Sequence, residues 1–160
     1  MRQSSIFASH LDAFRDVLGP LVALSPVADE GGFAVLRAVI PSGAVVPLHS
    51  HADRESFLVI EGEVEIWLDE DWRTYGAGEL IEVVPDAPHA IRNFAPDEAS
   101  LVLVTTARMA RFLGEVSAGR DEPDVTPERI EHFHRTSAAY GYWNGSPEHQ
   151  AAIGLILPAG

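Results

Sequence analysis

Short apolar runs recur along the middle of this 160-residue chain, and they constrain its fold more than any other feature. Each run is five to eight residues long, and turn-rich spacers such as Glu61-Gly62 and Pro85-Asp86-Ala87-Pro88 separate them. The runs span residues 33–40, 56–60, 63–68, 79–84, 89–94 and 100–106. Strands of this length at this spacing are typical of an all-β sandwich or barrel. We therefore expect an all-β fold whose barrel occupies residues 21–106.

The lead-in before the barrel shows a helical pattern instead. Leu11, Phe14 and Leu18 recur at helical spacing, and Gly19-Pro20 ends the pattern. This spacing predicts a short helix over residues 9–18.

The tail after the barrel, residues 107–160, carries two copies of one helix-start pattern. Thr126-Pro127-Glu128 and Ser146-Pro147-Glu148 each combine an N-cap residue, a proline at the first helical position and an acid in the first turn. We predict helices over about 107–118, 126–140 and 146–153. Because the tail is too short and too aromatic for an independent domain, residues 1–160 are expected to form a single domain. The tail would then pack on the barrel or on a second subunit.

The side-chain inventory removes several kinds of chemistry. All 11 basic residues are arginine, so a Schiff-base or P-loop lysine is excluded. The chain has no cysteine, so metal binding rests on histidine and carboxylate side chains. A net charge of −13 argues against nucleic acid and anionic membranes as partners. With no long apolar run and no basic-then-apolar leader, we expect a soluble, cytoplasmic protein without a signal peptide or transmembrane helix.

Four side chains are candidates for a metal site. His49 and His51 have the same parity, so on a strand their imidazoles point to the same face, and Glu55 keeps that parity after a short polar stretch. His89 lies in a later run, where Ile91 and Asn93 share its parity. Three imidazoles and one carboxylate suit Fe, Mn, Ni, Cu or Zn far better than Mg or Ca. The sequence therefore predicts one divalent transition metal.

These residues strongly resemble the two sequence motifs of the cupin superfamily. The first motif, G-x5-H-x-H-x3,4-E-x6-G, is matched at every marked position by Gly43, His49, His51, Glu55 and Gly62. The second, G-x5-P-x-G-x2-H-x3-N, is matched by Gly78, His89 and Asn93. The resemblance implies a jelly-roll barrel, also called a double-stranded β-helix, with the four ligands inside it. A looser resemblance links the chain to small quercetin-dioxygenase-like bacterial proteins with a single cupin domain.

The second motif is matched with two departures. Val84 stands where the family has proline, and Asp86 where it has glycine. The gaps between marked positions are preserved, so these departures concern the conformation of the loop before His89 rather than His89 itself.

Several further residues are candidates for a substrate pocket. Phe57 and Val59 share the parity of Glu55, as Ile91 and Asn93 share that of His89, and the apolar members would form either a pocket wall or plain core. Arg37 could bind a substrate carboxylate inside the barrel or lie on its outer face.

Histidine and aromatic residues outside the motifs have simpler interpretations. His132 and His134 form a second H-x-H, but on a helix they lie on nearly opposite faces, so solvated side chains are expected there. His10 and His149 are expected at the surface. Tyr140, Tyr142 and Trp143 could cap the barrel mouth or pack at a dimer interface.

The leading functional hypothesis is a metal-dependent oxygenase, of dioxygenase type, acting on a small aromatic or enolisable substrate. Here Glu55 can leave the metal and act as the catalytic base toward a substrate hydroxyl. Two alternatives stay open: an isomerase or lyase that uses the metal only as a Lewis acid, and a non-catalytic protein that holds metal or a small ligand. The resemblance also implies a homodimer, because cupins commonly pair their barrels.

Overall fold

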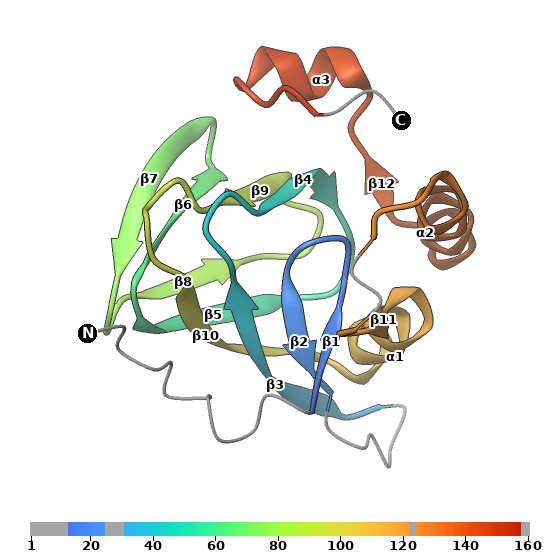
Figure 1. Cartoon of the computed structure of the whole chain (residues 1–160), viewed down its shortest axis with the longest axis horizontal. Helices are drawn as coiled ribbons and strands as arrows, with labels where there is room; N and C mark the ends of the chain where they lie inside the picture. Colours follow the sequence, from blue (N-terminus) through green and yellow to red (C-terminus); the bar gives the residue numbers. More distant parts are fainter. Residues whose placement is uncertain (1–12, 25–30, 122–123, 158–160) are drawn as a thin grey trace.

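Two antiparallel sheets face each other and enclose one core in a computed structural model of the chain, which describes residues 13–24, 31–121 and 124–157 (Figure 1). The larger sheet has seven strands in the order β11-β1-β2-β3-β10-β5-β8, and the smaller has five in the order β12-β4-β9-β6-β7. The strands are β1 (Phe14–Asp16), β2 (Leu21–Ala23), β3 (Phe33–Ile40), β4 (Val45–Ser50), β5 (Glu55–Glu61), β6 (Glu63–Leu68), β7 (Asp71–Gly76), β8 (Leu80–Val83), β9 (His89–Arg92), β10 (Ala99–Thr106), β11 (Ala118–Gly119) and β12 (Trp143–Asn144). The helices are α1 (Ala107–Val116), α2 (Pro127–Tyr140) and α3 (Pro147–Ala152).

The core lies between the two sheets and is built from alternate residues of the strands, because side chains along a strand point to opposite faces. Its fully buried members include Leu36, Val59, Val64, Ile66, Leu101 and Val83. β3 and β10 pair along all eight of their residues, from Ala99↔Ile40 to Thr106↔Phe33, which fixes the centre of the larger sheet. The predicted all-β jelly-roll fold is confirmed.

The expected helix in the lead-in is wrong where the structure describes it. Residues 9–12 lie outside the described part, and Phe14–Asp16 form strand β1, which pairs with β2. The backbone turns back at Leu18 and Gly19, which both have positive φ, and the side chain of Asp16 accepts a hydrogen bond from Gly19 N. The tight turn lets Phe14 pack against the barrel as a strand residue, and this tertiary contact overrides the helical spacing.

Three strands outside residues 21–106 extend the sheets. β1 and β11 lengthen the larger sheet, and β12 pairs with the outer edge of β4 in the smaller one. An edge strand presents unpaired N–H and C=O groups, so a neighbouring segment can be added without disturbing the core. Strand β7, which the sequence did not predict, also lies at an edge, joined to β6 by a turn in which Asp69 and Glu70 have positive φ.

The three helices of the tail are confirmed to within two residues at each end. Thr126 caps α2 by accepting a hydrogen bond from Arg129 N at 3.2 Å, as its predicted N-cap role requires. Ser146 caps α3 by accepting one from His149 N at 3.3 Å. The buried ring of Phe112 on α1 contacts Phe133, Tyr140 and Tyr142, so an aromatic cluster holds α1 and α2 together. None of the helices in the described part of the chain is long and apolar enough to cross a membrane.

Candidate metal centre

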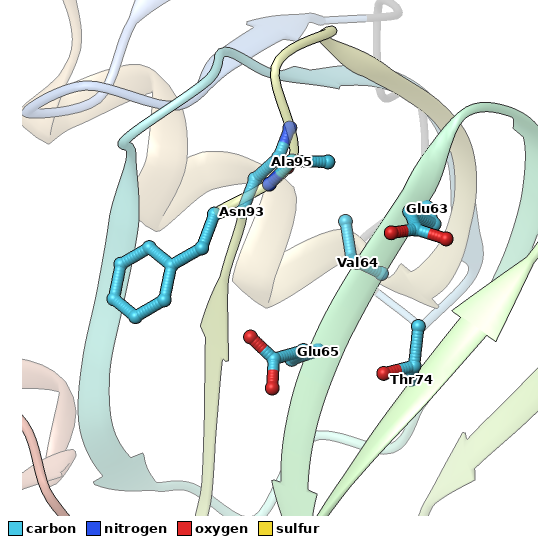
Figure 2. Close-up of a pocket in the computed structure, with 7 residues that line it drawn as sticks. Glu63, Val64, Glu65, Thr74, Asn93 and Ala95 are labelled. Atoms are coloured by element: carbon cyan, nitrogen blue, oxygen red, sulfur yellow. The ribbon is translucent and has the colours of Figure 1, made fainter.

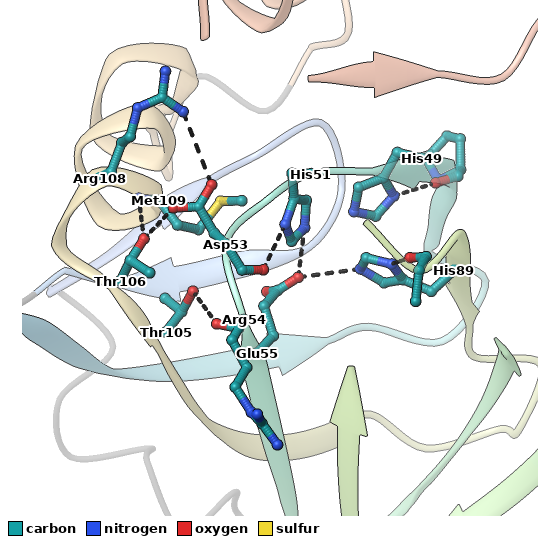
Figure 3. Close-up of polar contacts among 12 residues, drawn as sticks. His49, His51, Asp53, Arg54, Glu55, His89, Thr105, Thr106, Arg108 and Met109 are labelled. Atoms are coloured by element: carbon teal, nitrogen blue, oxygen red, sulfur yellow. Dashed lines mark hydrogen bonds and ion pairs between the residues drawn. The ribbon is translucent and has the colours of Figure 1, made fainter. Parts of the chain in front are cut away.

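Strands of both sheets bring His49, His51, Glu55 and His89 together (Figure 3). His49 lies near the end of β4 and His51 just beyond it, whereas Glu55 begins β5 in the opposite sheet and His89 begins β9. One potential ligand atom from each side chain lies within 4.8 Å of the others. His51, Glu55 and His89 are buried, and His49 is partly exposed.

Every imidazole of the cluster has its Nδ1 fixed by a backbone carbonyl two residues away. Nδ1 lies 2.7 Å from Pro47 O in His49, 2.8 Å from Asp53 O in His51 and 2.8 Å from Ala87 O in His89. A carbonyl oxygen can only accept, so Nδ1 must carry the proton in each ring. The other ring nitrogen, Nε2, is then left with a lone pair, which is the arrangement found around metal-binding histidines.

Glu55 places one carboxylate oxygen among these nitrogens. Its Oε1 lies 2.7 Å from Nε2 of His51 and 3.1 Å from Nε2 of His89. Burial alone would raise the pKa of Glu55, but the two imidazoles beside the carboxylate hold that pKa well below its usual range. Glu55 is therefore ionised at neutral pH and supplies the one negative charge in the cluster.

The histidines differ in how readily they take up a proton. Burial lowers the pKa of His49 to about 3, and the neighbouring His89 adds to the effect. His49 is consequently neutral at physiological pH, with its Nε2 lone pair available. For His51, burial lowers the pKa but the adjacent Glu55 carboxylate outweighs it and raises the pKa above its ordinary value.

The donor set fits a metal cation. Nε2 of His51 is buried and has no hydrogen-bond partner despite its short contact with Glu55. A buried nitrogen in that state is costly unless something completes its bonding. Three imidazole nitrogens and a carboxylate oxygen form an N/O set that suits a divalent transition metal.

The loop before His89 forms a tight turn despite its two departures from the cupin motif. Pro85 and Asp86 are the central residues of a turn closed by Ala87 N donating to Val84 O at 3.2 Å. Asp86 has φ 65°, the left-handed region that explains a glycine at this position. Aspartate tolerates that region better than most residues, and Asp86 N also donates to His51 O at 2.8 Å. The turn thus ties the loop to the segment that carries His51.

Most of the expected pocket residues are core or scaffold. Phe57, Val59 and Ile91 are buried in the main hydrophobic cluster. Asn93 uses its side chain on the backbone, because Nδ2 donates to Ile40 O and Asp97 O and Oδ1 accepts from Ala95 N. Asn93 therefore holds the turn after β9 and has little capacity left for a substrate.

The structure contradicts a pocket role for Arg37. Its neighbours Leu36 and Ala38 face the core, so Arg37 faces outward, and its guanidinium lies 5.5 Å from the ring centroid of Phe14 on the outer face. The alternation of buried and outward residues along β3 could have identified this face.

Two cavities in the described part of the chain lie away from the four-residue cluster. One, with a volume of about 200 Å³, lies beside β6 and β7 and includes Glu63, Glu65 and Thr74 among its lining residues (Figure 2). The other, of about 310 Å³, lies between α1 and α2. Neither contains a residue of the candidate metal centre.

A second layer of side chains surrounds His51, and sequence patterns gave no sign of most of it. The buried carboxylate of Asp53 accepts a hydrogen bond from the Thr106 hydroxyl, and Arg108 lies 3.9 Å from its other oxygen (Figure 3). The ring of Tyr142 lies 5.4 Å from the His51 ring, so of the three aromatic residues considered as caps this one reaches the cluster. Trp143 is instead 40% exposed.

The second H-x-H behaves as expected of solvated helix residues. His132 and His134 are exposed on α2, and His132 uses Nε2 to contact Glu115 O at 2.8 Å. Among the described residues, the cluster at His49 is the only group of three or more His, Cys, Asp or Glu side chains placed to hold a metal. His149 is exposed on α3, and His10 lies outside the described residues.

Comparisons with known proteins agree with this architecture. Residues 36–105 match the family model of the cupin domain. The Cnp3 cupin domain of Schizosaccharomyces pombe superposes with a TM-score of 0.52 at 18% identity, over 58% of this chain and 66% of that one. The polyketide cyclase RemF of Streptomyces resistomycificus superposes with a TM-score of 0.51 at 16% identity, over 55% of this chain and 65% of that one. A cupin-2 domain protein of Rhodospirillum rubrum, Rru_A2000, superposes with a TM-score of 0.51 at 12% identity, over 59% of this chain and 62% of that one.

This chain therefore spans just under two thirds of the length of each of those three structures, and identities this low establish the fold alone. No curated protein sequence matches the chain.

Fold and site together define the class: a jelly-roll barrel with a histidine-rich cluster that could bind a metal ion. Its residues 36–105 match the cupin domain, and its jelly-roll fold agrees with the cupin superfamily.

Proposed function

We propose that His49, His51, Glu55 and His89 bind one divalent transition metal and that the protein is an oxygenase acting on a small aromatic or enolisable substrate. The observation that carries the metal site is the orientation of the imidazoles. Three Nδ1–H groups are fixed by backbone carbonyls, so three Nε2 lone pairs face one ionised carboxylate. Neutral imidazoles would repel the carboxylate at the observed distances, so these atoms need a cation among them, either a metal ion or a proton on Nε2.

A bound Fe, Mn, Ni or Cu ion would supply Lewis acidity and open positions at which substrate and oxygen are oriented. Four protein donors leave such positions free in a metal that accepts five or six. His49 is the one partly exposed member of the ligand set, so small molecules would approach from its side. Apolar residues such as Phe57 and Ile91 lie in the core next to the ligands and keep the interior dry.

Glu55 is the residue that we propose as a base. Its carboxylate is ionised and is held at Oε1 by contacts with two imidazoles. A substrate hydroxyl acidified by binding to the metal would transfer its proton to this oxygen, and the substrate would become an electron-rich anion. Such an anion is the form in which aromatic alcohols and enols are readily oxidised.

The test begins with the metal. Protein purified without a metal-affinity tag would be analysed for metals, then stripped and reloaded separately with Fe(II), Mn(II), Ni(II), Cu(II) and Zn(II). Each form would be assayed with an oxygen electrode against flavonols, catechols and 1,3-diketones. We expect oxygen uptake that depends on a redox-active metal and is absent with Zn(II). Substrate turnover that continues without oxygen would reject the oxygenase and favour the isomerase or lyase.

A non-catalytic metal-binding role is the second candidate, and one observation favours it. Three of the four candidate ligands are buried, and the two cavities described above do not include them. A protein that only holds a metal ion needs no space for a substrate beside it. Tight metal binding with no turnover of any substrate class would support this alternative.

A further inference from the structure

Strand β4 contains a bulge directly before the first metal ligand. Along the pairing of β4 with β9, Val46 lies opposite Ile91 and His49 lies opposite His89. The chain thus advances three residues in β4 for two in β9, which places one extra residue in β4.

The bulge decides which way His49 points. Val46 packs against the barrel core, and two residues later Leu48 packs on the outside with Ala90 and Leu155. In an unbroken strand, Val46 and Leu48 would share a face, and His49 would point outward. The extra residue reverses the alternation, so His49 joins the inward face and its ring centroid lies 4.2 Å from that of His89.

The tail holds the bulge through the side chain of Gln150 on α3 and through one backbone hydrogen bond, from Gly145 N to Leu48 O at 2.9 Å. Oε1 of Gln150 accepts a hydrogen bond from Leu48 N at 2.8 Å, and its Nε2 donates to Leu48 O at 3.0 Å and to Gly145 O at 3.1 Å. Gln150 is 2% exposed, so water cannot replace these bonds. Gly145 lies so close that a Cβ there would be 3.0 Å from Nε2 of Gln150.

A second tail element, β12, contacts the same strand. β12 pairs with the end of β4 through Trp143↔Ser50 and Asn144↔His49, so the ligand His49 has β12 on one side and β9 on the other. The end of α3 is fixed by Trp72 of β7, whose Nε1 donates to Ile153 O at 2.7 Å. The match to the cupin family ends at residue 105, so the tail residues that contact β4 lie outside the matched region.

We propose that Gln150 is a positioning residue of the metal centre, which sets the direction of the His49 imidazole by holding the bulge at Leu48. The inference rests on the proposed function insofar as the cluster binds a metal. It adds that the tail is part of the centre, because the Gln150 amide replaces a neighbouring strand where the bulge interrupts the ladder. Metal binding and docking of the tail then stabilise each other, as thermodynamic linkage requires.

The experiment compares Co(II) binding by the wild-type protein with that of two variants. Gln150→Met keeps the length of the side chain but removes all three hydrogen bonds. Gln150→Glu keeps an acceptor for Leu48 N and loses both donated bonds. The control, Thr126→Ala, removes the N-cap of α2, which weakens the tail without touching β4. Affinity would be measured by competition with a chelator, and ligand geometry from the visible d–d bands of bound Co(II).

We expect both Gln150 variants to bind Co(II) about 10- to 100-fold more weakly, the usual effect of losing a residue that supports a metal ligand. Their d–d bands should shift, whereas Thr126→Ala should bind within about twofold of wild type with an unchanged spectrum. Wild-type affinity and spectrum in the Gln150 variants would overturn the positioning role and leave the metal site standing. If the wild-type protein fails to bind Co(II), both proposals fall.

A measurement on the wild-type protein covers the case in which the variants do not fold. Leu48 N and Gly145 N donate the hydrogen bonds that join the bulge to the tail. Saturating Co(II) should slow hydrogen exchange at both amides at least about tenfold if tail docking is linked to the metal. Val17 N, which donates to Pro20 O in a distant turn, serves as the reference amide. Equal exchange of the Leu48 and Gly145 amides with and without Co(II) would contradict the linkage.

Discussion

At the scale of single residues, the backbone prepares each histidine for its role. Pro47, Asp53 and Ala87 supply the three carbonyls that fix the imidazole protons on Nδ1. None of these contacts depends on the identity of the supplying side chain, because the acceptor is always main-chain oxygen. The ligand set is therefore preorganised by the path of the chain, with Glu55 as its charged member.

The first prediction concerns the ligands themselves. His51→Ala and His89→Ala each remove one of three nitrogen donors, so metal content after purification should fall sharply, to less than about a tenth of wild type. His134→Ala, an exposed histidine on α2, is the matched control and should leave metal content unchanged. Elemental analysis of the three variants checks this. Full occupancy in both ligand variants would show that the assignment of ligands is wrong.

The second prediction separates the two roles of Glu55. Glu55→Gln keeps the shape and an oxygen donor but removes the charge and the ability to accept a proton. Three neutral imidazoles can hold a divalent ion without a carboxylate, so metal content should fall only modestly. The rate per bound metal should fall by roughly 10²–10⁴-fold, the usual contribution of a general base. Once a substrate is known, an unchanged rate per bound metal would leave Glu55 as a ligand without a base role.

At the scale of elements, the turn between β8 and β9 shows how this chain meets a conformational requirement with an unusual residue. Proline at Pro85 presets the turn, and the next position needs positive φ. Asp86 adopts φ 65° at a cost that glycine would avoid. This cost is small because the aspartate is exposed and its main-chain N–H is bonded to His51 O.

The third prediction follows from that cost. Asp86→Gly should raise the free energy of unfolding by roughly 0.5–1 kcal/mol, the balance between relieved strain and the greater freedom of an unfolded glycine. Asp97→Gly, at an exposed position with negative φ, relieves no backbone strain. This variant should therefore lower the free energy of unfolding by a similar amount. Urea denaturation of the metal-free proteins measures both changes. A loss of stability in Asp86→Gly would mean that the aspartate side chain stabilises the loop.

At the scale of the whole molecule, the outer face of the larger sheet is the feature that remains to be explained. Strand register places Val35 beside Val104, and Val102, Leu58 and Leu80 in one row across three strands. Leu80 is 60% exposed and Phe33, further along β3, 75%. Contiguous exposed apolar side chains usually mark an interface. Together with the pairing of barrels that is common in cupins, this face suits a second copy of the chain.

The fourth prediction is a homodimer through that face. Light scattering at micromolar concentration should give about twice the 17.3 kDa mass of the chain. Val104→Glu would place a charge in the interface and should weaken the dimer roughly tenfold or more. Val125→Glu changes another exposed valine, just before α2, and should leave the mass unchanged. A monomeric wild-type protein would refute the dimer, and a dimer unaffected by Val104→Glu would place the interface elsewhere.

Features that depend on local chemistry could be predicted from the order of the residues. Strand alternation, proline and glycine in turns, and the helix starts at Thr126 and Ser146 are set by neighbouring residues. The grouping of His49, His51, Glu55 and His89 could also be predicted, since the cupin motif spacing carries these four residues.

Tertiary structure alone decided what depends on contacts between distant segments. Phe14 belongs to a strand because a turn returns it to the barrel, and Arg37 faces outward because its neighbours on β3 face the core. The inward direction of His49 depends on a bulge in β4 that is held by Gln150, 102 residues away from Leu48. Local spacing cannot encode such a contact, because it exists only after both sheets and the tail have folded together.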